Sequence, residues 1–341
     1  MPLRLAMLGM WHVHADGIVR QVAEHPDEFT LVGFHDGDAA VVANRVREWT
    51  PRLGALRVFD DPAALVREPI DGVVVEGRVS ENLGLARLAL EAGKPVMLEK
   101  PAGVEFDEFR RLIDLARAKN LHVQMIYLFR YMNSVREMLK RARTGELGDI
   151  YHYRARLPKD LPSYERFVNE LAGYGGGIFF EMAGHVIDMM IAMLGAPRRV
   201  TPFLAHHHRE GPATFIDNAV AMFEYPGAWA SIEVPAMEVA PHSRRIEVFG
   251  TEGAIVIPHL GSGHLKNRNV QPIEIYRRGD DDWQTLELPA NPLQISDLRE
   301  FAAVLASNKQ PDFSLEHDLS VQETLLRASG MWGGCELKQS W

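Results

Sequence analysis

The sequence predicts an α/β protein in which a doubly wound parallel sheet is followed by an α+β domain with a large, mainly antiparallel open sheet. Two observations lead to this fold class. In the first third of the chain, short apolar runs alternate with amphipathic stretches, as buried parallel strands alternate with helices. Further on, pairs of strand-like segments flank turns that contain Gly or Asp, as in antiparallel hairpins.

The first domain is expected over residues 1–123. Its predicted strands are LRLAMLG (3–9), FTLVGFHD (29–36), DGVVVEG (71–77), KPVMLEK (94–100) and LHVQMIY (121–127). Amphipathic helices are predicted between them at 38–49, 81–93 and 106–120. The last of these ends on Asn120, a residue that tolerates the left-handed conformation of a helix C-terminus.

The second domain is expected over residues 124–341. Its predicted elements are helix 134–148, strand 149–157, helix 176–194, strand pairs 218–234, 244–258 and 273–288, and helices 294–307 and 315–330. The strand pairs favour a sheet that is mainly antiparallel.

Composition excludes several classes of protein. The 341 residues are enough for two domains with a sizeable core. The net charge of −9, without long blocks of one sign, argues against a nucleic-acid partner or an anionic membrane surface. No apolar run approaches the ~20 residues of a membrane span, and no signal-peptide pattern precedes Leu3. The single cysteine, Cys335, excludes an internal disulfide. We therefore expect a reduced cytoplasmic protein.

The segment RLAMLGMWHVHADG (4–17) predicts a nucleotide-binding turn. Gly9 follows a buried strand directly, where a glycine allows the tight turn that presents amides to a pyrophosphate. Trp11 and His14 occupy the positions of the second and third glycines, so a plain strand-to-helix loop remains the alternative. Asp36 ends the second strand, where an acidic group binds ribose hydroxyls, and it favours the nucleotide interpretation. Cofactor contacts are expected from Gly9, Met10, Trp11, His12 and Asp36.

The segment KPVMLEKPAG (94–103) places Glu99 and Lys100 at the end of another buried strand. Ligands bind at the carboxyl ends of strands in such sheets, and desolvation there lowers the pKa of a lysine toward the range useful for proton transfer. The alternative is a surface lysine before a helix that begins with proline.

The segment GGGIFFEMAGHVIDMMIAMLG (175–195) predicts a mostly buried helix. Glu181, His185 and Asp188 fall on one face at i, i+4 and i+7, and buried polar groups need partners. A catalytic lysine with its substrate would supply them; a core histidine is the alternative. Glu181 and His185 lack a convincing third metal ligand, so no metal site is predicted. The HHH run at 206–208 is expected at the surface.

Four segments resemble one known family: LEKP, GGGIFFEMAGHVID, TGELGDIYHYRA and RIEVFGTEGAIVI. They are similar to segments of the Gfo/Idh/MocA family, the relatives of glucose–fructose oxidoreductase and inositol dehydrogenase, in order and across essentially the whole chain. The resemblance implies an N-terminal Rossmann domain and a second domain whose sheet forms a homodimer or homotetramer. It also implies hydride transfer between a nicotinamide cofactor and a sugar, cyclitol or related polyol.

The resemblance assigns roles by position. Lys100 matches the catalytic lysine and His185 the active-site histidine, which together handle the hydroxyl proton. Glu181 stands where an aspartate is usual, to accept substrate hydroxyls or orient His185, and Asp188 is expected to be structural. Asp36 matches the ribose-binding acid. Gly37, which follows it in place of a Ser-Arg pair, favours NAD over NADP.

Two departures from the family pattern keep other functions open. The glycine-rich turn retains only Gly9, and Gly77, Arg78 and Asn82 replace the usual Thr-Pro and His beside the nicotinamide. We still expect these three residues, Glu99 and Lys100 to contact the cofactor. The alternatives are a catalytically inactive nucleotide-binding or regulatory protein, and an NAD-assisted glycoside lyase or hydrolase.

Overall fold

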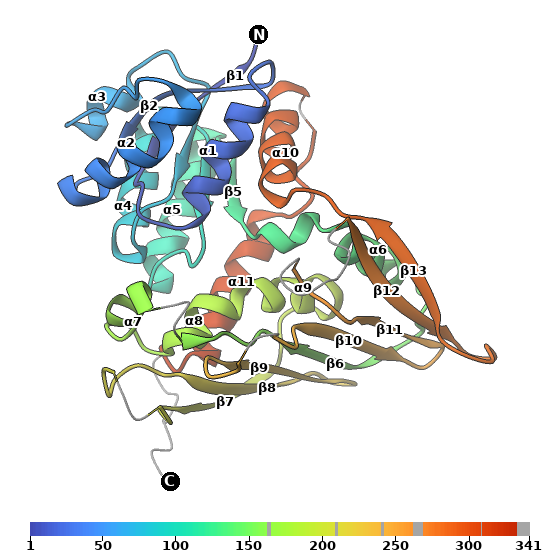
Figure 1. Ribbon diagram of the computed structural model, residues 1–341. Helices are drawn as coiled ribbons and strands as arrows, with labels where there is room; N and C mark the ends of the chain where they lie inside the picture. The colour runs from blue at the N-terminus through green and yellow to red at the C-terminus, as the bar shows by residue number, and fades with distance from the viewer. Residues whose placement is uncertain (162–164, 209–210, 240–241, 262–268, 308, 333–341) are drawn as a thin grey trace. The chain divides into compact units, whose positions relative to one another are not determined.

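The computed structural model describes residues 1–161, 165–208, 211–239, 242–261, 269–307 and 309–332. Cys335 lies outside these residues. The chain forms two compact units (Figure 1), the first of Met1–Tyr127 and Pro292–Leu315, the second of Leu128–Asn291 and Glu316–Trp341. The domains expected at 1–123 and 124–341 stay a prediction. The main difference between the compact units and the expected domains is that Pro292–Leu315 belongs to the first unit.

The first unit is built on a five-stranded parallel sheet with the order β2-β1-β3-β4-β5. Its strands are β1 (Leu3–Leu8), β2 (Phe29–His35), β3 (Gly72–Val75), β4 (Val96–Glu99) and β5 (Val123–Ile126). Every residue of β3, β4 and β5 is buried, as expected for parallel strands covered on both faces. All five predicted strands are confirmed.

The helices of the first unit are α1 (His14–Glu24), α2 (Ala39–Leu53), α3 (Pro62–Val66), α4 (Val79–Glu91), α5 (Phe106–Lys119) and α10 (Leu293–Ser307). Helix α1 packs beside α10, and α4 packs beside α5 (Figure 1). The left-handed Asn120 ends α5 at φ 53°, as predicted. In the sheet, β2 lies on one side of β1 and β3 lies on the other, so the direction in which strands are added reverses between β1 and β3. Ligands of such sheets bind at this switch point, at the carboxyl ends of the two strands.

The second unit holds an eight-stranded sheet with the order β13-β12-β11-β10-β6-β9-β8-β7. Its strands are β6 (Ile150–Arg156), β7 (Arg199–Ala205), β8 (Asn218–Glu224), β9 (Trp229–Pro235), β10 (Arg245–Gly250), β11 (Gly253–Ile257), β12 (Val270–Arg277) and β13 (Gln284–Pro289). Neighbouring strands are antiparallel except β6 and β9. The predicted open, mainly antiparallel sheet is confirmed.

The helices of the second unit are η1 (Leu128–Tyr131), α6 (Asn133–Arg143), α7 (Glu165–Leu171), α8 (Gly177–Met182), α9 (Gly184–Leu194) and α11 (Leu315–Ala328). Helices α8 and α9 contact the sheet at β8, β9 and β6. In β8 and β9, buried residues alternate with residues that are at least partly exposed, so one face of this sheet forms core and the other is more accessible. Among the described residues, no helix combines the length and hydropathy that a membrane crossing requires.

The single helix predicted over 176–194 is wrong. Two helices, α8 and α9, occupy this stretch and are separated at Ala183. The amide of Val186 donates to the carbonyl oxygen of Ala183, three residues back, at 3.0 Å. This tighter turn interrupts the regular helix, so Glu181 lies on α8 while His185 and Asp188 lie on α9.

Candidate functional site

The turn after β1 crosses the turn after β3 at very short range. Gly9 has φ +77°, and a Cβ added to it would lie 2.3 Å from the backbone nitrogen and Cα of Gly77. The amide of His12 donates to the carbonyl oxygen of Glu76 at 2.9 Å. Only glycine fits at position 9, because both the positive φ and the approach of Gly77 exclude a side chain there.

A buried arginine holds the same turn from the side of α2. Arg45 donates from Nε to the carbonyl oxygen of Met10 at 2.8 Å. Its Nη2 donates to the carbonyl oxygen of Trp11 at 3.3 Å and to the carbonyl oxygen of His12 at 3.1 Å. Three successive carbonyl oxygens of the turn therefore bind one guanidinium. The sequence did not single out Arg45, since an arginine on an amphipathic helix is normally exposed.

Asp36 lies beside the turn, as predicted. Its carboxylate accepts hydrogen bonds from the amides of Met10 at 2.7 Å and Asp38 at 2.9 Å. Arg78 donates to Asp38 at 2.9 Å, and its guanidinium lies over the ring of Trp11, 5.5 Å from the centroid. Arg78 thus links the turn after β3 to the first turn of α2.

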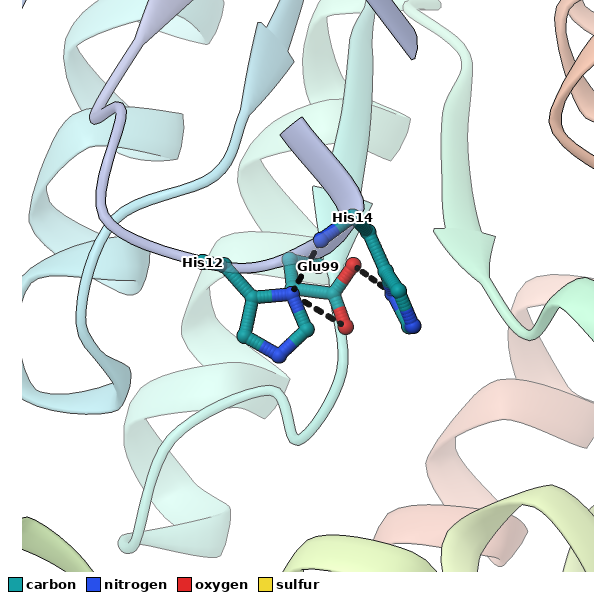
Figure 2. A group of neighbouring side chains, drawn as sticks. All are labelled: His12, His14 and Glu99. Carbon is teal, nitrogen blue, oxygen red and sulfur yellow. Dashed lines mark hydrogen bonds and ion pairs between the residues drawn. The ribbon is translucent and has the colours of Figure 1, made fainter. Parts of the chain in front are cut away.

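Two histidines and a glutamate converge at the carboxyl ends of β1 and β4 (Figure 2). Nδ1 of His14 lies 2.9 Å from Oε2 of Glu99, and Nδ1 of His12 lies 3.5 Å from Oε1. The two imidazole rings meet edge to face with centroids 4.5 Å apart. Burial lowers the pKa of His14. Burial opposes the ionisation of Glu99, but His12 and His14 hold its pKa below its usual value.

Glu76, at the end of β3, is a second buried carboxylate in this region. It is fully buried, and its Oε2 lies 3.4 Å from Nδ1 of His12. Burial, together with the nearby charge of Glu99, raises the pKa of Glu76 to about 8. Sequence reasoning missed Glu76, because the residue reads simply as the end of an apolar strand.

Lys100 is buried at the end of β4, as predicted. Only 2% of the residue is exposed, and its Nζ lies 3.9 Å from Oε1 of Glu99. The surface-lysine alternative is therefore wrong. The peptide bond between Lys100 and Pro101 is cis.

Asn82 provides a test of whether the site fits a polar cofactor. It lies in the first turn of α4 with 1% of its surface exposed. Among the described residues, none forms a hydrogen bond with its carboxamide nitrogen or oxygen. A buried amide without partners costs free energy, so a polar ligand is the expected complement. Its place beside Gly77 fits the predicted role in cofactor binding.

The predicted residues of the second unit fall into two environments. Glu181 and His185 are both buried, and the ring of His185 lies 4.7 Å from that of Phe129, centroid to centroid. Asp188 is structural, as expected: it accepts two bonds from Nε of Arg130 and one from Nη2 at 2.6–3.0 Å, and it contacts His317 at 2.7 Å.

The structure thus brings together, within the first unit, all the cofactor residues predicted from the sequence, together with Lys100. It places Glu181 and His185 in the second unit. The HHH run follows β7: His207 is exposed, and His206 is half-buried with its Nδ1 3.0 Å from Asp217.

Family models match both parts of the chain. Residues 3–127 match the model described as an oxidoreductase family with an NAD-binding Rossmann fold. Residues 135–256 match the GFO/IDH/MocA C-terminal domain.

Named relatives agree with these matches. An uncharacterized oxidoreductase of Escherichia coli, YdgJ, is 28% identical over 66% of this chain and 63% of its own length, so this match spans less than two thirds of that relative. The NAD-dependent scyllo-inositol 2-dehydrogenase of Bacillus subtilis is 23% identical over 87% of both chains. The structure is also similar to KijD10, a 3-ketoreductase from Actinomadura kijaniata solved with NADP and TDP-benzene, with a TM-score of 0.79, 20% identity and coverage of 95% of this chain and 96% of that one.

Proposed function

The chain belongs to the Gfo/Idh/MocA family of NAD(P)-dependent oxidoreductases, and we propose that it interconverts a hydroxyl and a carbonyl group on a sugar, cyclitol or related polyol, with NAD as the cofactor. The observation that carries the proposal is the burial of Lys100 at the carboxyl end of β4, in the same unit as Gly9, Asp36 and Asn82. The inositol dehydrogenase and the 3-ketoreductase among its relatives support this substrate class.

NAD would be held by residues of the first unit. The turn after Gly9 would face the pyrophosphate, Asp36 the adenosine ribose, and Asn82 a polar group of the cofactor. The nicotinamide supplies hydride transfer when it is bound. A carboxylate at position 36 disfavours the 2′-phosphate of NADP through charge repulsion, and Gly37 brings no cation to offset it.

Lys100 would hold the hydroxyl proton at Nζ. Because the amine is buried, its interaction with a substrate oxygen is weakly screened by water. Oε1 of Glu99 lies 3.9 Å from this amine. His185 and Glu181 are proposed as further proton-transfer and hydroxyl-binding groups, and the family resemblance is the support for these two assignments.

A second candidate function is nucleotide binding without turnover. Arg78 favours this candidate, because it is one of the residues that replace the family's usual Thr-Pro and His beside the nicotinamide. Its guanidinium binds Asp38 and lies over the ring of Trp11. The buried Lys100 weighs against this candidate, since nucleotide binding without turnover does not require a group that handles the substrate proton.

We also propose self-association through the outer face of the eight-stranded sheet. Phe203 on β7 is 60% exposed and Trp229 on β9 is 54% exposed, although large apolar side chains are usually buried. Sedimentation velocity tests this: a dimer or tetramer is expected, and a monomer at micromolar concentrations contradicts it.

The test of the function is calorimetric titration with NAD and NADP, followed by a polyol panel read at the NADH absorbance. We expect tighter binding of NAD than of NADP, and turnover with at least one polyol. Asp36→Asn should weaken NAD binding and narrow its margin over NADP, while Asp60→Asn at an exposed position should change neither. Binding of NAD without turnover on any polyol would favour the second candidate, and no binding of either nucleotide would contradict both.

A further inference from the structure

We propose that His12, His14 and Glu99 form a binding site for a first-row divalent transition-metal ion, for which Zn²⁺ is the appropriate probe. Each residue offers a ligand atom, and these atoms all lie within 4.8 Å of one another. The cluster adjoins the residues proposed to hold the cofactor, and the metal proposal does not rest on the identity of the cofactor or the substrate.

The distances within the cluster are close to those of a bound ion. His14 Nδ1 lies 2.9 Å and His12 Nδ1 lies 3.5 Å from oxygens of Glu99. Zinc bonds to nitrogen and carboxylate oxygen of about 2.0–2.2 Å allow two ligand atoms to lie at most about 4.4 Å apart. Nδ1 of His12 accepts a hydrogen bond from the amide of His14 at 3.3 Å (Figure 2). The ring of His12 would therefore have to rotate away from that amide to place an ion between all three residues.

The types of ligand select the class of metal. Two imidazoles and a carboxylate suit zinc and neighbouring first-row divalent ions, whereas calcium and magnesium prefer oxygen ligands. Three protein ligands also leave one coordination position open, as in many catalytic zinc sites. The HxH spacing of His12 and His14 brings both rings from one short turn to the end of β4.

Glu76 adds a second buried carboxyl group beside the cluster. It is fully buried, and neither of its carboxylate oxygens accepts a hydrogen bond from a described residue. The same holds for Oε1 of Glu99. The ionised form of a buried carboxyl group is costly, and a nearby dication would lower the cost of that form. Oε2 of Glu76 lies 3.4 Å from Nδ1 of His12, so this carboxyl group is close enough to the cluster to be affected by an ion bound there.

A comparison within the chain shows what a satisfied cluster looks like. Asp188, His317 and Asp318 also carry metal-ligand atoms near one another. There, Arg130 donates to both carboxylates, so a cation already occupies the centre of that cluster. In the first cluster Lys100 forms a longer ion pair, with its Nζ 3.9 Å from Oε1 of Glu99.

The experiment is equilibrium dialysis of the chelator-treated full chain against Zn²⁺, without nucleotide, with the bound metal measured by mass spectrometry. We expect about one tightly bound zinc per chain. His14→Asn and Glu99→Gln should each weaken binding by about tenfold or more. The double variant His207→Gln/His208→Gln removes another histidine-rich surface and should retain the bound zinc, as the matched control.

X-ray absorption on the unmutated protein gives a second readout that does not depend on the folding of a variant. A first shell with imidazole nitrogen and carboxylate oxygen is expected. The proposal is overturned if the wild-type chain binds no zinc, or if the zinc is lost from the His207/His208 variant and kept by His14→Asn. Zinc binding and NAD binding are measured separately, so failure of either proposal leaves the other intact.

Discussion

The guanidinium of Arg45 donates a hydrogen bond from Nε to the carbonyl oxygen of Met10 over 2.8 Å, from α2 to the turn that stands in place of the glycine-rich loop. With its bonds to Trp11 and His12, this contact fixes the direction of three peptide units. The turn retains only the first glycine of its motif, and the hydrogen bonds from Arg45 hold its backbone in place.

Arg45→Met should therefore destabilise the protein and weaken NAD binding. The carbonyl oxygen of His12 still accepts a hydrogen bond from the amide of Ala15, and that of Trp11 is only partly buried. The main cost is therefore the buried carbonyl of Met10, at about 1–3 kcal/mol, and a loss of about 2–3 kcal/mol in the free energy of unfolding is expected. Urea denaturation and calorimetry with NAD measure the two effects. Arg47→Met, at an exposed position on the same helix, is the control and should change the free energy by less than about 0.5 kcal/mol.

Gly9→Ala should be the most damaging single-methyl change in the turn. The new Cβ would adopt a positive φ and lie 2.3 Å from the backbone of Gly77, so the turns after β1 and β3 would have to separate. We expect a loss of more than about 2 kcal/mol, together with loss of NAD binding. Gly37→Ala is the matched control, because nothing lies within 4 Å of its added Cβ. Equal stability of the two variants would contradict the close crossing.

Arg130→Met should destabilise the second unit by about 3–5 kcal/mol near neutral pH, because Asp188 and Asp318 would lose their buried counter-charge. The effect should depend on pH. Burial opposes the ionisation of Asp188, but Arg130 and His317 hold its pKa below the usual value. The wild-type protein therefore keeps the stability from this ionised group above the usual Asp pKa and loses it only as the pH falls through the lowered value.

Without Arg130, burial dominates and raises the pKa of Asp188 in the folded variant. The folded variant then binds a proton more readily than its unfolded chain does, so its free energy of unfolding increases as the pH falls. Burial already raises the pKa of Asp318 in the wild-type protein, and the loss of Arg130 should raise it further. The stability gap between wild type and variant should narrow from about pH 7 to about pH 5 in urea denaturation. A gap that is constant or widens over this range would mean that the carboxylates are not held by Arg130. Arg327→Met, at a partly exposed position, serves as the control.

Local patterns predicted most of the fold. The five buried strands and Asn120 at the end of α5 follow from apolar runs and from the left-handed tolerance of asparagine. The break at Ala183 could not be predicted, because its backbone dihedrals are helical and only the bonding of Val186 marks the division.

The candidate site was predicted in part. Its position at the strand ends, including Lys100 and Asp36, follows from strand order and motif spacing. Arg45 and Glu76 could not be identified, because their burial depends on which elements pack against them. The contacts of His12 and His14 with Glu99 join segments 85 or more residues apart, so no local pattern reports them.

The central claim is that Lys100 handles the proton of the substrate hydroxyl in an NAD-dependent reaction. The most direct test is Lys100→Met, with turnover followed at the NADH absorbance and NAD affinity measured by calorimetry on the same preparation. Lys140→Met, at a position whose side chain is 72% exposed, is the control. We expect Lys100→Met to lower kcat by about 10²–10⁴-fold while NAD still binds, and Lys140→Met to behave as wild type. A Lys100→Met variant that keeps most of its kcat would remove this lysine from the mechanism and contradict the claim.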